Sequence, residues 1–182
     1  MPLEIVLVEP EIPQNTGNIA RTCVAVGAKL HLVEPLGFSL EDRQVKRAGL
    51  DYWFDLDLQV WPNLDLLLKS VAARPENGQG IYYATTKGAQ VYSDIAYPEQ
   101  TILIFGKETR GLPESLLMAH PERCLRIPML PERRSLNLAN SVAVMTYEVL
   151  RQWDFPNLKK ENKIESGRNH HDPKRTAYPA IY

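Results

Sequence analysis

Three segments of the chain combine glycine, proline and polar side chains of the kinds that bind ligands and move protons. They are residues 13–21, 105–113 and 127–141. Each lies next to a short apolar run that is typical of a buried strand, and α/β proteins bind their ligands at strand ends. Loops rich in glycine and proline expose backbone N–H and C=O groups, so we expect much of the recognition to be made by backbone atoms.

Common nucleotide-binding and metal-binding motifs are missing. No G-x-G-x-x-G follows the first apolar run, which argues against the usual dinucleotide or class I methyltransferase loop. Gly106 and the lysine after it resemble part of a P-loop, but Thr101 stands in place of its first glycine and Glu108 in place of its Ser/Thr. The four histidines and two cysteines, Cys23 and Cys124, do not have zinc-ligand spacing. We therefore expect neither an NTPase nor a metal site.

Strand-like and helix-like patterns alternate along the chain and predict the scaffold of these segments. Apolar runs typical of buried strands cover residues 3–8, 29–33, 54–61, 81–84, 101–105 and 124–128. Helical patterns cover residues 19–26, 41–50 and 138–153, and a further helix begins at residues 62–65. This alternation indicates an α/β fold with a mostly parallel sheet. The last helix is apolar on two sides, which is typical of a subunit contact.

Composition indicates one globular domain. The chain has 182 residues, of which 44% are hydrophobic and 24% charged. We expect a domain over residues 1–155 and a flexible tail over residues 156–182, because the tail has few residues able to form a core. No apolar run is long enough for a membrane span, no export signal is evident and two thiols suit a reducing compartment, so we expect a cytoplasmic protein.

The charge of the chain does not by itself indicate a nucleic-acid partner. The net charge is −1, so binding to an anionic polymer would depend on local basic clusters. Arg133 and Arg134 form one such cluster, and Arg43 and Arg47 would share one face of a helix. Such groups are usually solvated, but these four arginines are the candidates for contacts with RNA phosphates.

In order and in type, the three segments resemble the motifs of the SPOUT superfamily of S-adenosylmethionine-dependent RNA methyltransferases. Within it they resemble the small tRNA (cytidine/uridine-34) 2′-O-methyltransferases, over about residues 1–153. The resemblance implies an α/β knot, in which the C-terminal part of the chain threads through a loop to form a deep trefoil. It also implies a homodimer in which the partner completes each active site, with tRNA as substrate, S-adenosylmethionine as cofactor and S-adenosylhomocysteine as product.

The resemblance also implies roles for individual residues. The expected catalytic residues are Asn15, Arg21, Glu108, Ser135 and Asn137. The expected cofactor-binding residues are Ala84, Gly106, Ile127, Ser135, Leu136 and Leu138. A ribose 2′-hydroxyl is a poor nucleophile at neutral pH, so the reaction needs in-line positioning and a route for the proton. Because arginine stays protonated in proteins, we expect Arg21 to hold a phosphate or stabilise the developing alkoxide rather than act as a base.

Other interpretations stay open at this point. The chain could methylate a 2′-hydroxyl elsewhere in tRNA or in rRNA, because members of the superfamily share these motifs. It could also be a cofactor-binding RNA-binding module without transfer activity, in keeping with its near-neutral charge. Asn15 and Asn137 could serve only as helix caps, and Arg21 and Glu108 only as surface residues.

Overall fold

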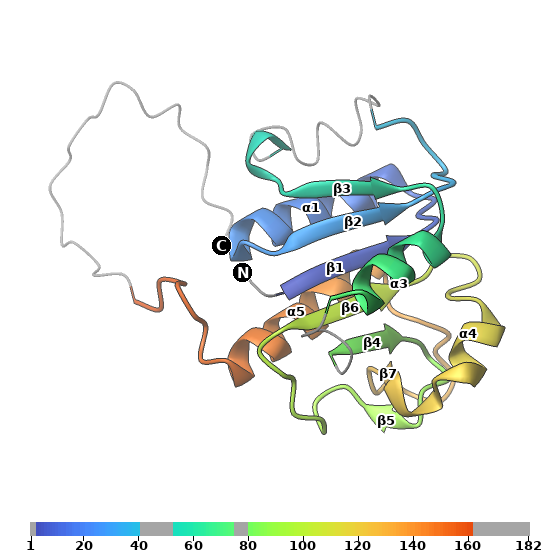
Figure 1. Cartoon of the computed structure of the whole chain (residues 1–182). Helices are drawn as coiled ribbons and strands as arrows, with labels where there is room; N and C mark the ends of the chain where they lie inside the picture. The colour runs from blue at the N-terminus through green and yellow to red at the C-terminus, as the bar shows by residue number, and fades with distance from the viewer. Residues whose placement is uncertain (1–2, 41–52, 75–79, 162–182) are drawn as a thin grey trace, which may run out of the picture.

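The computed structural model describes residues 3–40, 53–74 and 80–161, and its strands form one parallel sheet (Figure 1). The strands are β1 (Leu3–Val8), β2 (Lys29–Val33), β3 (Leu58–Trp61), β4 (Ile81–Ala84), β5 (Gln90–Val91), β6 (Thr101–Phe105) and β7 (Cys124–Arg126). Their order across the sheet is β3-β2-β1-β6-β4-β7-β5, and these neighbouring strands all pair in parallel. The predicted α/β class with a mostly parallel sheet is confirmed.

Helices cover both faces of the sheet (Figure 1). Helices α1 (Pro13–Val26) and α5 (Leu138–Gln152) pack together on one face, and α3 (Leu64–Ala72) packs on the other. The short helix α4 (Glu114–Ala119) follows β6, and two 3₁₀ turns cover Trp53–Asp55 and Pro121–Arg123. The central strands β1 and β6 are therefore buried on both sides, which explains why they read as continuous apolar runs in the sequence.

The structure corrects the predicted boundaries of two elements. Helix α1 begins at Pro13, so Asn15 lies inside the helix, and the alternative that it serves only as a helix cap is wrong. The predicted strand over residues 54–61 is a strand only from Leu58, and Trp53–Asp55 forms a 3₁₀ turn. The short elements β5 and α4 were not predicted. The expected helix over residues 41–50 lies outside the described residues, as does most of the expected tail. The trefoil knot stays a prediction.

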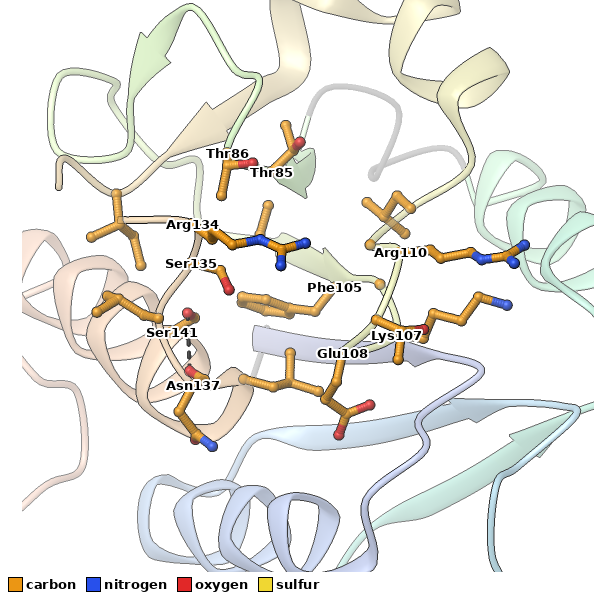
Figure 2. A pocket seen from close by; sticks show the side chains of 18 of the residues that line it. Thr85, Thr86, Phe105, Lys107, Glu108, Arg110, Arg134, Ser135, Asn137 and Ser141 are labelled. Atoms are coloured by element: carbon orange, nitrogen blue, oxygen red, sulfur yellow. Dashed lines mark hydrogen bonds between the residues drawn. The ribbon is translucent and has the colours of Figure 1, made fainter. Parts of the chain in front are cut away.

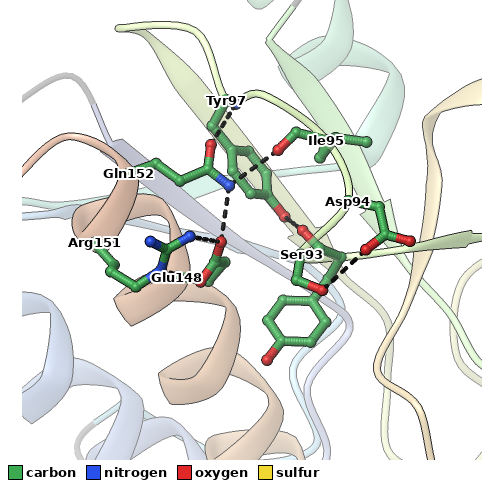
Figure 3. Close-up of polar contacts among 8 residues, drawn as sticks. Ser93, Asp94, Ile95, Tyr97, Glu148, Arg151 and Gln152 are labelled. Atoms are coloured by element: carbon green, nitrogen blue, oxygen red, sulfur yellow. Dashed lines mark hydrogen bonds and ion pairs between the residues drawn. The ribbon is translucent and has the colours of Figure 1, made fainter.

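The carboxyl end of α5 is attached to the loop before β6 by side-chain hydrogen bonds (Figure 3). Gln152 Nε2 donates to the carbonyl oxygen of Ile95 at 2.9 Å and to Glu148 Oε1 at 2.8 Å, and Gln152 Oε1 accepts from Tyr97 N at 3.0 Å. Trp153 Nε1 donates to the carbonyl oxygen of Tyr97 at 3.2 Å. Because Tyr97 is itself buried, these bonds hold the position of α5 against the sheet.

A buried histidine links three strands on the α3 face of the sheet. His31 Nδ1 accepts a hydrogen bond from Trp61 Nε1 at 3.0 Å, and His31 Nε2 lies 2.6 Å from Glu4 Oε2. An indole N–H can only donate, so Nδ1 carries no proton and Nε2 donates to the Glu4 carboxylate. Arg74 Nη1 donates to the other oxygen of Glu4, also at 2.6 Å.

Acid is expected to remove the contribution of Glu4 to stability. Burial raises the pKa of Glu4, but its interactions with His31 and Arg74 together outweigh burial, so the pKa is lowered overall. Such a group stabilises the fold above its unfolded pKa, and the stabilisation is lost as the pH falls through the folded pKa. We expect Glu4→Gln to lower the free energy of unfolding by about 2 kcal/mol at pH 7 in urea titrations. The difference from wild type should shrink below about pH 4; a difference of the same size at pH 3 would contradict this role.

Candidate active site

A cavity of about 900 Å³ opens at the carboxyl ends of β4, β6 and β7 (Figure 2). It is lined by parts of the three segments that the sequence singled out, and by the residues that follow β4. Its apolar wall includes Phe105, Leu125, Ile127, Leu138 and Met145. Parallel α/β sheets bind ligands at this edge, and the volume lies in the range of small-molecule sites.

Most of the expected site residues line this cavity. They are Asn15, Ala84, Gly106, Glu108, Ile127, Arg134, Ser135, Leu136, Asn137 and Leu138. Arg21 and Arg133 are exposed and are not among the lining residues. Arg43 and Arg47 lie outside the described residues.

The cavity also has polar lining residues that the sequence analysis did not select. They are Thr85, Thr86, Lys87, Lys107, Thr109, Arg110 and Ser141. Thr85 and Thr86 directly follow β4, so the rule that ligands bind at strand ends could have found them. Lys107 and Arg110 stand inside one of the three segments, but no feature of the sequence indicated that their side chains face a cavity.

The loop after β6 folds back tightly on itself. Gly111 N donates to the carbonyl oxygen of Lys107 at 2.8 Å, and Gly111 has a left-handed backbone with φ of 70°. A Cβ atom on Gly106 would lie 2.0 Å from the carbonyl carbon of Gly111 and 2.2 Å from Leu112 N. The loop therefore has this conformation only with glycine at position 106.

Glu108 binds the amino end of α1. Its Oε2 accepts from Glu11 N at 2.9 Å, and its Oε1 accepts from Ile12 N at 3.3 Å and from Asn15 Nδ2 at 2.8 Å. Helix α1 has no side-chain cap from its own N-cap residue, Ile12. Glu108 thus provides acceptors where the helix leaves N–H groups without partners, and its negative charge suits that end of the helix dipole.

Asn15 connects Glu108 to the start of α5. Asn15 Oδ1 accepts from Asn137 Nδ2 at 3.0 Å, and Asn137 Oδ1 accepts from Ala139 N at 2.9 Å and Asn140 N at 3.3 Å. Asn137 is therefore the cap of α5 and also lines the cavity. The chain of bonds from Glu108 through Asn15 to Asn137 ties all three segments to one another.

Two more contacts attach the loop after β6 to the segment before α1. Lys107 Nζ forms an ion pair with Glu9. Thr109 donates from its backbone N to Glu11 Oε2 at 3.0 Å and from its hydroxyl to Glu11 Oε1 at 2.9 Å. Each segment thus supplies a carboxylate to the other, which fixes their relative position.

Glu108→Gln is expected to destabilise the fold. A glutamine has one acceptor oxygen in place of two and adds an NH₂ group, so at least one N–H partner of Glu108 would lose its acceptor. We expect the free energy of unfolding in urea titrations to fall by about 1–3 kcal/mol. Glu99→Gln changes the same charge at an exposed position outside both the cavity and this network, and should have no effect. Equal unfolding midpoints for Glu108→Gln and wild type would show that the network contributes nothing to stability.

Arg21 and Asn15 lie on different sides of α1. Six residues of helix advance by about 9 Å and leave the two side chains about 120° apart around the axis. Asn15 is buried against the cavity, whereas Arg21 is exposed. One cavity of one chain does not receive both side chains.

Metal and thiol chemistry have no support in the described parts of the chain. Within them, no group of three or more His, Cys, Asp or Glu residues is placed to hold a metal ion. Burial raises the pKa of Cys23 to about 12 and also raises the pKa of Cys124, which disfavours both thiolates. Within the same residue ranges, no helix has the length and apolar character needed to cross a membrane.

Known RNA methyltransferases are similar to this chain in sequence. The model of the SpoU rRNA Methylase family matches residues 2–147. The tRNA (cytidine(34)-2′-O)-methyltransferase of Methylovorus glucosotrophus is 51% identical over 153 residues, which covers 84% of this chain and 96% of that protein.

Solved structures of methyltransferases are also similar to this chain. One, described as "Structural insights into the 2-OH methylation of C/U34 on tRNA", has a TM-score of 0.78 and 42% identity, and the match covers 85% of this chain and 99% of that chain. The SpoU methyltransferase AviRb from Streptomyces viridochromogenes, in complex with the cofactor AdoMet, has a TM-score of 0.73 and 27% identity. That match covers 83% of this chain and 57% of the longer AviRb chain.

Proposed function

Because the chain belongs to the SpoU rRNA methylase family, we propose that it transfers a methyl group from S-adenosylmethionine to the 2′-hydroxyl of nucleotide 34 of tRNA, a cytidine or modified uridine. The observation that carries the proposal is the meeting of all three segments at one cavity, joined there by the bonds from Glu108 through Asn15 to Asn137. The relatives described for position 34 match along almost their whole length, which supports this nucleotide over other sites in RNA.

The residues of the cavity fit S-adenosylmethionine. The apolar wall of Phe105, Leu125, Ile127, Leu138 and Met145 suits a flat adenine, and the hydroxyls of Thr85 and Ser135 suit polar groups. Gly106 contributes only backbone atoms to the wall, and the tight packing of its loop sets the shape of the cavity there. The residues that would hold the cofactor include Ala84, Gly106, Ile127, Ser135, Leu136 and Leu138.

When bound, S-adenosylmethionine supplies an electrophilic methyl group on a positively charged sulfur. The chain must then hold the ribose 2′-oxygen in line with that methyl group and keep water away. Ser135 and Asn137, on the opposite side of the cavity mouth from Arg110, are placed to hydrogen-bond the ribose (Figure 2). Glu108 already accepts three N–H groups, so its role is to position α1 and Asn15. Arg21 stabilises the negative charge that develops on the 2′-oxygen.

Arg21 performs this role in the cavity of a second subunit. Exposed apolar side chains lie just before α1 and α5 and along α5: Ile12 is 42% exposed, Leu136 40%, Val144 38% and Tyr147 48%. A homodimer that covers these residues would shield them from water and bring Arg21 of one subunit to the cavity of the other. Arg134 lines the cavity and Arg133, the residue before it, is exposed. Both contact phosphates of the tRNA in the cytoplasm.

Transfer of labelled methyl from S-adenosylmethionine to unmodified bulk tRNA tests the proposed function. We expect label on the ribose of nucleotide 34, identified by mapping the modified nucleotide. Label at another nucleotide would show a different target. Cofactor binding without label on tRNA or rRNA would favour a binding module that lacks transfer activity.

A further inference from the structure

A second, smaller cavity of about 300 Å³ adjoins the first at the loop after β6. The two cavities share Lys87, Lys107, Arg110, Gly111 and Leu112 as lining residues. Val8, Glu9, Pro113 and Glu114 complete the lining of the second cavity. A ligand that fills the first cavity can therefore continue into the second along one wall.

The charges in the second cavity do not balance. Lys107 is paired with Glu9, and Lys87 Nζ lies 2.7 Å from Glu114 Oε1. Arg110 has no ion-pair or hydrogen-bond partner for its side chain within the described parts of the chain. Three cationic side chains thus face two carboxylates, and the positive charge left over is that of Arg110.

The backbone holds Arg110 in a defined place. It lies in the turn that Gly111 N closes by donating to the carbonyl oxygen of Lys107, and the next residue, Leu112, is buried. Lys107 and Arg110 extend toward the same side of the loop, whereas Arg134 comes from the opposite wall of the first cavity (Figure 2). The turn therefore fixes the backbone from which Arg110 extends, and its exposed guanidinium is accessible to an anion.

We propose that Arg110 binds a phosphate group of the RNA strand in the second cavity while the target ribose occupies the first. This inference rests on the proposed function. A guanidinium offers two parallel N–H donors that match two phosphate oxygens, and no carboxylate of the described chain competes for them. A strand whose ribose enters the first cavity carries phosphates on both sides of that ribose, so the adjoining cavity is where one of them lies. The same two N–H donors would also match the carboxylate of the cofactor, and the test below distinguishes this carboxylate from an RNA phosphate.

Two binding measurements test this inference. Filter retention at several salt concentrations measures the affinity for unmodified tRNA, and calorimetry measures the affinity for S-adenosylmethionine. Arg110→Ala should weaken tRNA binding about tenfold, as expected for a lost charge-assisted contact. It should also reduce the slope of log affinity against log salt by about 0.7, because one phosphate contact with a single strand is lost. Cofactor affinity should not change. Arg110→Lys should keep the salt slope and lose part of the affinity, because it keeps the charge but not the fork.

Lys29→Ala is the matched control. Lys29 lies at the amino end of β2, whereas the cavities lie at the carboxyl ends of the strands. The variant removes one positive charge, just as Arg110→Ala does. It should leave tRNA binding unchanged. Wild-type tRNA affinity and salt slope in Arg110→Ala would overturn the inference. A loss of cofactor affinity alone would also overturn it and assign Arg110 to the cofactor carboxylate. Binding does not require turnover, so a wild-type protein that binds tRNA without methylating it would overturn only the proposed function.

Discussion

The Gly106→Ala variant is expected to lose methyl transfer by at least about 100-fold and to bind S-adenosylmethionine only weakly. The new methyl group would lie 2.0 Å from the carbonyl carbon of Gly111, which is far inside van der Waals contact. Both atoms next to it belong to backbone, so no side chain can rotate away, and the loop itself must move. A shift of about 1 Å in an active site is enough to cost roughly 100-fold in rate.

The shift would also disturb α1. Lys107 and Glu108 follow Gly106 directly, and their partners are Glu9 and the first residues of the helix. We therefore expect a lower unfolding midpoint in urea together with the loss of cofactor binding measured by calorimetry.

Gly111→Ala is the matched control in the same loop. Gly111 has a φ of 70°, but a Cβ atom there would have no neighbour within 4 Å. We expect the free energy of unfolding to fall by roughly 1–2 kcal/mol, because alanine is strained in a left-handed conformation but meets no clash here. If both variants kept wild-type cofactor affinity, the conformation of this loop would not determine the shape of the cavity.

The Arg21→Ala variant is expected to lose transfer by about 100-fold to 1000-fold, the usual cost of removing one group that stabilises charge in a transition state. Its affinity for S-adenosylmethionine should remain that of wild type, because Arg21 does not line the cavity of its own chain. Transfer of labelled methyl to tRNA and calorimetry measure these two quantities on the same preparation.

Mixing two inactive variants tests whether Arg21 acts in the partner's cavity. After subunit exchange, half of the dimers in an equal mixture of Arg21→Ala and Gly106→Ala would be mixed. Each mixed dimer would have one intact cavity faced by one intact Arg21, so activity should return to about a quarter of wild type. No recovery, despite mixed dimers seen by native mass spectrometry, would place Arg21 and the cavity of one chain in the same site. A stable monomer in light scattering at micromolar concentration would exclude the two-subunit site altogether.

Local patterns were sufficient to predict most of the sheet. Strands β1 and β6 are covered on both faces, so nearly every side chain in them is apolar and the run is unmistakable. Helices α3 and α5 bury one stripe each, and Asn63 and Asn137 cap them with their own side chains. β5 was missed because two residues are too few to form a pattern.

The start of α1 was predicted wrongly for a different reason. The N–H groups of Glu11 and Ile12, at the start of this helix, donate to Glu108. Glu108 is 97 positions away from Glu11 in the chain, and no local pattern reveals such a partner. Asn15 therefore resembled a cap in the sequence, although its side chain connects Glu108 to Asn137.

The sequence by itself determined the class of the fold, the three segments of the site and, through their resemblance to a known family, the residues expected to act there. These depend on residue types and on spacing along the chain. Only the tertiary structure decided which side chains share a cavity, because parallel strands bring together loops that are far apart in sequence. It placed Arg110 beside the cavity and Arg21 away from it, since the direction of a side chain depends on the packing of the element that carries it.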